Sequence, residues 1–182
     1  SEILSRDTDM LEEDRIEFIK LINKESNRME SILEDLLIIS KMDRLDYELN
    51  LEKTNIKDVI IENIDSIKNK ILKKGLEYKI TVEDCTLNID KNKMGQVILN
   101  LVRNSTNYTD EGEISIVGYI EGSKYVLKVI DTGIGISKED LEKIFKRFYR
   151  VDAARSRDTG GSGLGLSICK NVVLKHGGSI SV

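Results

Sequence analysis

The feature that most constrains this chain is a stretch of 33 residues, 13–45, that contains neither glycine nor proline. Its apolar and small residues recur three and four positions apart, which is the periodicity of an amphipathic α-helix. This seam consists of Ile19, Ile22, Ser26, Met29, Leu33, Leu36 and Ser40, and it is widened by Ile32, Leu37 and Ile39. The wide stripe favours a four-helix bundle over a two-stranded coiled coil. A single helix cannot bury it, so the segment packs on its own domain or, as its length and seam favour, serves as a dimerisation helix.

The rest of the chain alternates between strand-like and helix-like segments. We predict helices over 56–73, 92–106 and 164–175, a helix that begins at Ser137 and carries Phe148, and short strands over 49–53 and 78–82. A hairpin is predicted around the turn 121–123, and a last strand is predicted to begin at Ser179. Ser137 and Asp140 resemble a capping box. Strands and helices in this order predict an α+β fold, a two-layer sandwich of a mixed sheet and helices.

Composition excludes several classes of protein. The formal net charge of −4 disfavours a dedicated nucleic-acid surface. No run approaches the ~18 apolar residues that a membrane helix needs, and no signal peptide is visible. Cys85 and Cys169 form no C-x-x-C pair and are expected to be reduced thiols without a special role.

Two asparagines stand out in the predicted helix over 92–106. Asn100 and Asn104 are four residues apart, so they project from the same side, at the edge of the apolar stripe. Their amide oxygens suit magnesium, which prefers oxygen ligands and takes few of them from the protein. The same pair can also simply cap or solvate the helix.

Asp131 ends a predicted strand and is followed by Gly133 and Gly135. A carboxylate at that place can accept a hydrogen bond from the exocyclic amine of adenine, and the glycines let the backbone pass close under the ring. A plain strand-to-turn connection is the other interpretation of this short pattern.

The segment 160–168 reads GGSGLGLSI and opens a predicted helix. Backbone N–H groups at such a helix start favour phosphate. The segment is not a P-loop, since GxxxxGK[ST] is absent, and it is not a convincing dinucleotide-binding fingerprint. Arg147, Arg150 and Arg155 surround it; they are either surface charges or clamps on the phosphates.

These motifs, in this order, resemble the catalytic and ATP-binding domain of sensor histidine kinases, within the Bergerat-fold ATPase superfamily. Residues 96–109 (QVILNLVRNSTNYT) resemble the N box, 131–136 the first glycine box, 145–150 (FKRFYR) the F box and 161–166 the second glycine box. The His176-Gly177-Gly178 turn also matches. The resemblance covers nearly the whole chain. It implies a Bergerat fold preceded by a long bundle-forming helix.

The resemblance implies a role for each matching position. Asn104 would ligate Mg²⁺ with Asn100 beside it, Tyr108 would pack near the adenine, and Asp131, supported by Gly133 and Gly135, would hold the adenine amine. Arg150 and Arg155 would contact phosphates. The lid over the triphosphate would consist of Gly161, Ser162, Gly163, Leu164, Gly165 and Leu166. Asn107 stands where the resemblance implies a phosphate-binding lysine, so that contact would fall to an arginine.

The implied domains are a partial dimerisation and histidine-phosphotransfer hairpin over 1–46 and a catalytic ATP-binding domain over 47–182, which is cut short at its C-terminal strand. The phospho-acceptor histidine of the family lies on the first hairpin helix and is absent from this sequence. The only histidine, His176, is expected to be structural. The implied activity is that of a protein-histidine kinase in a two-component system, which binds Mg-ATP and donates the γ-phosphate to the stem histidine, for relay to a response-regulator receiver domain. The implied parent is a cytoplasm-facing homodimer that reaches the membrane only through other segments.

Three alternatives stay open at this point. An ATP-hydrolysing relative such as gyrase or Hsp90 would carry a glutamate base where Asn100 stands, and an amide cannot accept a proton from water. A serine kinase of the same superfamily fits the long stem helix poorly. A dimeric scaffold with a decayed nucleotide site has only Asn107 in its favour.

Overall fold

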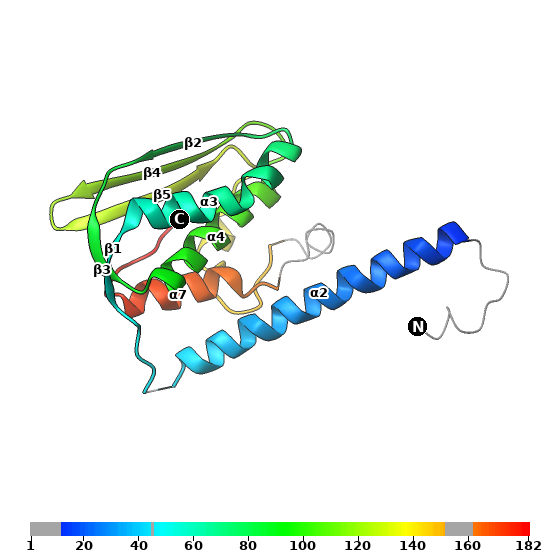
Figure 1. The fold of residues 1–182 in the computed structure, drawn as a ribbon, viewed down its shortest axis with the longest axis horizontal. Helices are drawn as coiled ribbons and strands as arrows, with labels where there is room; N and C mark the ends of the chain where they lie inside the picture. The colour runs from blue at the N-terminus through cyan, green and yellow to red at the C-terminus, as the bar shows by residue number, and fades with distance from the viewer. Residues whose placement is uncertain (1–11, 45, 152–161) are drawn as a thin grey trace.

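A computed structural model describes residues 12–44, 46–151 and 162–182 (Figure 1). The structure has one long helix that projects from an α+β domain. Its helices are α2 (Glu12–Met42), α3 (Ile56–Lys73), α4 (Lys91–Tyr108), α5 (Lys138–Leu141) and α7 (Gly165–Lys175). Its strands are β1 (Glu52–Asn55), β2 (Glu77–Val82), β3 (Thr86–Ile89), β4 (Glu113–Glu121) and β5 (Lys124–Asp131). Among the described residues, no helix is both long enough and apolar enough to span a bilayer.

A three-stranded mixed sheet forms one layer of the domain. Its order is β2-β4-β5, with β2 parallel to β4 and β4 antiparallel to β5. The hairpin between β4 and β5 turns at Gly122, whose φ of 61° suits glycine. Strands β1 and β3 form a separate antiparallel pair. The mixed sheet confirms the predicted α+β class.

Helices α3 and α4 cover one face of this sheet and close the larger core (Figure 1). The buried side chains are mostly isoleucine and valine, which pack well between a helix and a pleated surface. They are Ile56, Val59, Ile60, Ile64, Ile67, Ile71, Leu76, Ile89, Ile98, Val102, Ile114 and Ile116. Each helix starts at a side-chain cap: Asn55 Oδ1 accepts from the N–H of Lys57, and Asp90 Oδ1 accepts from that of Lys93.

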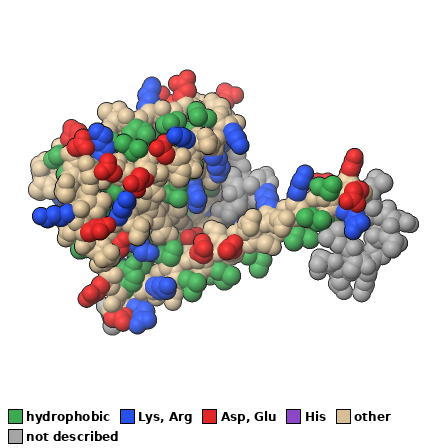
Figure 2. All heavy atoms as spheres, in the orientation of Figure 1, with side chains coloured by type: hydrophobic (Ala, Val, Ile, Leu, Met, Phe, Trp, Pro, Cys, Tyr) green, Lys and Arg blue, Asp and Glu red, His purple; other side chains and the backbone are tan. Residues whose placement is uncertain are grey.

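A second core joins the C-terminal end of α2 to α4 and α7. Its buried residues are Ile39, Met42, Val97, Leu164, Ile168, Cys169 and Val172. The earlier part of α2 leaves this core. Its apolar side chains at Ile19, Met29 and Leu33 are 49%, 64% and 59% exposed, and apolar side chains are visible along the projecting helix (Figure 2). The long helix was therefore predicted correctly, and its stripe has no partner within the described part of the chain.

Four local predictions differ from the structure. The short strand predicted over 49–53 forms later in the chain, as β1 over Glu52–Asn55. The predicted helix from Ser137 ends at Leu141, because the chain then makes turns that lead to Phe148, which has a φ of 62°. The Ser137 hydroxyl donates to the Asp140 carboxylate (2.6 Å), so Ser137 makes no side-chain cap to the backbone. The predicted strand at 179–182 is not formed; Ile180 packs instead against the second core.

Candidate functional site

The C-terminal half of α4 presents the polar side chains expected from the sequence. Asn100, Asn104 and Asn107 follow one another at intervals of four and three residues, so they form one stripe along the helix. All three are half-buried. The Nδ2 of Asn100 donates to the carbonyl of Gly165 at 3.4 Å, which brings this stripe to the start of α7.

Asp131, the last residue of β5, lies on one flank of this stripe. Its Oδ2 accepts a hydrogen bond from the hydroxyl of Ser105 at 2.9 Å, and its Oδ1 accepts one from the N–H of Gly133 at 3.0 Å. Ser105 is only 6% exposed, so this side chain is fixed within α4. Both carboxylate oxygens are therefore oriented, while Asp131 itself stays exposed.

Gly133 passes very close to the end of α4. A Cβ added there would lie 2.4 Å from the carbonyl oxygen of Tyr108 and 2.9 Å from Asp131 Oδ1. The next residue, Ile134, donates its N–H to the same Tyr108 carbonyl at 3.2 Å. Ile134, Ile136 and Tyr108 expose 57%, 39% and 38% of their surface. An apolar surface thus lies beside an oriented carboxylate, a combination that suits a planar base with an exocyclic amine.

The glycine segment at the start of α7 is braced by the preceding turn. The N–H of Phe148 donates to the carbonyl of Gly163 at 2.9 Å, and Gly163 has a φ of 73°. Leu164 donates its N–H to Ser162 Oγ at 3.1 Å. The side chain of Leu164 is fully buried in the second core, so any contact with a ligand would be through its backbone. Gly165 and Leu166 are half-buried in the first turn of the helix.

The arginines of this region differ in their partners. Arg147 pairs at 2.7 Å with Asp43, the residue immediately after α2, so this arginine links the segment to the end of the stem helix. Arg150 lies with its Cγ against Gly163, and its Nη2 is buried without a hydrogen-bond partner among the described residues. A buried guanidinium nitrogen that lacks an acceptor suits an anion. Arg155 and Gly161 lie outside the described residues.

Helix α2 also contacts the glycine segment. The hydroxyl of Ser162 donates to Asp35 Oδ2 at 2.9 Å. Burial raises the pKa of Asp35, and the Ser162 hydrogen bond and the charge of Arg103 partly oppose this rise. The hydrogen bond from Arg147 lowers the pKa of Asp43. Ser162 therefore ties the candidate lid to α2, and Arg147 ties the segment before it to the end of the same helix.

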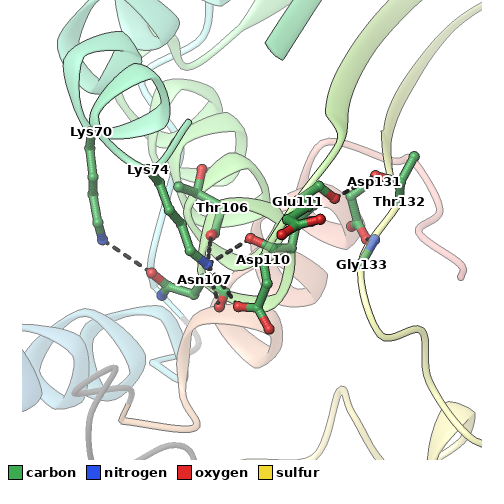
Figure 3. A network of polar contacts seen from close by, with 10 residues as sticks. Lys70, Lys74, Thr106, Asn107, Asp110, Glu111, Asp131, Thr132 and Gly133 are labelled. Atoms are coloured by element: carbon green, nitrogen blue, oxygen red, sulfur yellow. Dashed lines mark hydrogen bonds and ion pairs between the residues drawn. The ribbon is translucent and has the colours of Figure 1, made fainter. Parts of the chain in front are cut away.

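A cluster of polar contacts closes the other flank of α4 (Figure 3). Lys74 Nζ donates to the carbonyls of Thr106 (2.9 Å), Asn107 (3.3 Å) and Thr109 (2.6 Å). These are carbonyls at the C-terminal end of the helix, where a cation is favourable. Lys70 Nζ reaches the side chain of Asn107, whose Oδ1 accepts at 3.1 Å.

His176 and the two cysteines behave as the sequence predicted. His176 Nε2 accepts from the N–H of Asp90 at 3.0 Å, and its Nδ1 lies 2.8 Å from the carbonyl of Val172. It therefore joins the end of α7 to the start of α4. Cys85 and Cys169 are free, and burial raises the pKa of Cys169 to about 12.

Sequence reasoning missed Ser105 and Lys70. Ser105 could have been noticed, because a serine in a helix interior immediately after Asn104 has a hydroxyl that needs a partner. Lys70 offered no signal, since its contact with Asn107 spans 37 residues. Within the described ranges, no group of three or more His, Cys, Asp or Glu side chains could hold a metal ion.

Residues 89–182 match the family described as "Histidine kinase-, DNA gyrase B-, and HSP90-like ATPase". The chain belongs to this family. The matched range contains Asn100, Asn104, Asp131 and the glycine segment, so the motifs and the geometry described above fall inside one ATPase-family domain.

Curated relatives place this ATPase-family domain among the sensor histidine kinases. The chain is 39% identical over 171 residues to the sensor histidine kinase WalK of Bacillus subtilis strain 168, an alignment that covers 90% of the chain and 27% of WalK. It is 37% identical over 172 residues to the sensor protein SrrB of Staphylococcus aureus strain NCTC 8325 / PS 47, covering 91% of the chain and 29% of SrrB. The chain therefore belongs to the sensor histidine kinases and contains their ATPase-family domain.

A solved structure shows the same architecture, including the long helix. The histidine kinase ThkA, in complex with the response regulator protein TrrA, superposes with a TM-score of 0.72 at 27% identity over 94% of this chain and 46% of that one. This agreement confirms the expected Bergerat fold. The chain spans less than a third of the length of WalK and SrrB.

Proposed function

We propose that this domain binds Mg-ATP and donates the γ-phosphate to a histidine on a dimerisation stem, for relay to an aspartate of a response-regulator receiver domain. The main support for this proposal is the fixed orientation of the Asp131 carboxylate. Ser105 and Gly133 orient both of its oxygens beside an apolar surface, which prepares it to accept the adenine amine. A carboxylate rejects the carbonyl that guanine has at that position, so the site should prefer adenine nucleotides.

The remaining roles follow the path from the base to the phosphates. Tyr108 would pack near the adenine, with Gly133 and Gly135 beneath it. Arg150 and Arg155 would contact phosphates. The lid over the triphosphate would consist of Gly161, Ser162, Gly163, Leu164, Gly165 and Leu166. The partnerless Nη2 of Arg150 supports this part of the proposal.

Asn104 would hold magnesium, with Asn100 beside it. The donor chemistry fits, because amide oxygens are hard ligands and Asn100 already gives its Nδ2 to Gly165, which leaves its oxygen for another partner. Bound magnesium would neutralise charge on the phosphate oxygens. The asparagines would orient the triphosphate, and Arg150 would hold its charge in place for in-line attack by the stem imidazole.

The proposal extends to the arrangement of the parent protein. Residues 1–46 would be part of the dimerisation and phosphotransfer hairpin, and 47–182 the catalytic domain. The exposed apolar stripe of α2 supports a homodimer through this helix. We place the domain in the cytoplasm, where ATP is available.

Calorimetric titration of the purified chain with Mg-ATP tests the binding step. The wild type should bind Mg-ATP and not Mg-GTP, whereas Asp131→Ala should lose most of the affinity. Asp84→Ala is the matched control, because Asp84 is an exposed aspartate that pairs with Lys57 far from α4. A wild type that shows no heat of binding contradicts the proposal, and equal binding by Asp131→Ala contradicts the role of this carboxylate.

A second experiment tests transfer. A histidine-bearing stem domain of a related kinase is mixed with the chain and γ-labelled ATP, and label should move to the stem histidine only when the chain is present. Rapid release of inorganic phosphate without labelling of the stem would favour an ATP-hydrolysing protein instead. Nucleotide binding without either result would favour a scaffold.

A further inference from the structure

The side chains around α4 follow a definite order from the base side to the opposite flank. With about 100° of rotation per residue, Ser105 lies on one side of Asn104 and Arg103 on the other. Tyr108 falls between Ser105 and Asn104, and Asn107 falls between Asn104 and Arg103. A nucleotide whose base sits at Asp131 therefore crosses Tyr108 and Asn104 before it reaches Asn107.

Lys70 stands at the far end of this path. It comes from α3 rather than from α4, and its Nζ donates to Asn107 Oδ1 at 3.1 Å. Figure 3 shows Lys70 on the side of α4 opposite Asp131 and Gly133. The resemblance implies a lysine at position 107 of α4. In this chain Asn107 stands there, and its side chain holds the ammonium group of Lys70 from α3 at the same place.

The surroundings of Lys70 are positively charged. Burial and the nearby charges of Arg103 and Lys74 lower the pKa of Lys70. Lys and Arg side chains gather on this part of the domain, where α3 ends (Figure 2). Within the described part of the chain, Lys70 forms no ion pair, and Asn107, its hydrogen-bond partner, is neutral. Lys74 pairs with Asp110, and Arg103 lies near Asp35. A lysine such as Lys70, whose charged neighbours are both positive, is stabilised by a negatively charged ligand.

Lys74, the residue that caps the C-terminal end of α3, is an example of a structural lysine in the same region. It donates to three backbone carbonyls and pairs with Asp110 at 3.4 Å, so its charge is fully used inside the fold. Lys70 makes a single contact to a side-chain amide, which a phosphate oxygen can replace or share. Lys74 therefore stabilises the end of α4, whereas Lys70 can bind a ligand.

We propose that Lys70 binds the terminal phosphate of ATP and makes the site prefer the triphosphate over shorter nucleotides. This inference rests on the proposed ATP binding. A lysine acts on phosphate as a compact point charge, so its contribution grows with the charge of the phosphate it meets. Lys70 of α3 would thus supply, beside Asn107, the charge expected from a lysine of α4, in addition to the phosphate contacts proposed for Arg150.

The test compares the dissociation constants of ATP, ADP and AMP, with magnesium, for wild type and variants. Lys70→Ala should weaken ATP binding about tenfold, ADP binding less, and AMP binding less than twofold. Lys68→Ala is the matched control, because Lys68 is a lysine of the same helix that pairs with Asp65. It should bind all three nucleotides as the wild type does.

A double variant that moves the positive charge from α3 to α4 provides the most specific test. The double variant Lys70→Ala/Asn107→Lys returns a cation to the same place from α4, so it should restore the preference for ATP. If Lys70→Ala binds ATP as tightly as the wild type, or weakens all three nucleotides equally, the inference is overturned. Failure of the wild type to bind any nucleotide would instead overturn the proposed function.

Discussion

The two flanks of α4 are built in different ways. On the Asp131 side, Ser105 and Gly133 hold both carboxylate oxygens, and Gly133 lies close to the Tyr108 carbonyl. On the Arg150 and Lys70 side, among the described residues, a guanidinium nitrogen is buried without a partner and the Lys70 ammonium group donates to a neutral amide. The first flank therefore holds an oriented acceptor, and the second holds cations that lack an anionic partner in the described part of the chain.

This difference indicates how the domain would divide recognition. A base is planar and neutral, so it is recognised by a rigid surface with one oriented acceptor. A triphosphate is flexible and highly charged, and its negative charge neutralises the cations on the second flank. Substitutions on the two flanks should therefore have distinguishable effects on nucleotides with different numbers of phosphates.

The largest effect is expected from Gly133→Ala. The added Cβ would press on the Tyr108 carbonyl and on Asp131 Oδ1, and because that contact is with backbone it cannot be relieved by a rotamer change. Affinity for ATP, ADP and AMP should fall equally, by roughly 100-fold, near the upper end of the ~1–3 kcal/mol of overpacking. Titration calorimetry with each nucleotide measures this.

Gly122→Ala is the control for that variant. Gly122 has a positive φ, which Gly133 lacks, but a Cβ at Gly122 meets no atom within 4 Å. It should lower thermal stability slightly and leave nucleotide affinity unchanged. If Gly133→Ala spared AMP while weakening ATP, the two flanks would not be independent.

Arg150→Ala should remove a phosphate contact on the second flank. ATP binding should weaken about 10- to 30-fold, as expected for a charged hydrogen bond of ~1.5–3 kcal/mol, while AMP binding changes little. Arg147→Ala, which removes a charge from the same segment but pairs with Asp43, should bind nucleotides normally. Equal losses for the two arginine variants would contradict the assignment.

Lys74→Ala should affect folding more than binding. Three carbonyls at the end of α4 lose their donor, so the free energy of unfolding should fall by about 1–2 kcal/mol. Urea denaturation measures this change. The exposed Lys73 on the same turn provides the comparison, and an unchanged midpoint for Lys74→Ala would show that water replaces the ammonium group without loss.

The smallest effects concern the two stem aspartates, which should respond to pH in opposite directions. The pKa of Asp35 is raised in the folded state, so the folded protein favours the protonated carboxyl. The stability that the protonated carboxyl contributes is present in acid and is lost as the pH rises above about 4, where Asp35 ionises. The pKa of Asp43 is lowered, so its contribution is present at neutral pH and lost in acid. Relative to the wild type, Asp35→Asn should gain stability with rising pH and Asp43→Asn should lose it. Thermal melts between pH 3 and 7 measure both, and the same sign for both variants would contradict this assignment.

Periodicity and turn chemistry were enough to predict most of the fold. The amphipathic patterns of α3, α4 and α7 and the glycine turn between β4 and β5 are local signals, and the structure confirms them. Strand β3 and the turns after Leu141 were missed because they depend on pairing and packing rather than on local pattern. The path of the chain near Phe148, with its positive φ, is determined by its contact with Gly163.

The candidate site was predictable in its motifs and not in its supporting contacts. Asn100, Asn104 and Asp131 were identified from spacing, and their roles remain predictions. The groups that hold them come from distant parts of the chain: Ser105 lies 26 residues from Asp131, and Asp35 lies 127 residues from Ser162. Such pairs become visible only when the chain is folded.

The engagement of His176 has a practical consequence for assays of this protein. It is the only imidazole in the sequence, and both of its ring nitrogens face backbone partners, one at Asp90 and one at Val172. Neither nitrogen is available to a phosphoryl donor while the fold is intact. The chain should therefore form no phosphohistidine of its own. Acid-labile phosphate found in a mixture with a stem domain can be attributed to the stem without separating the two proteins.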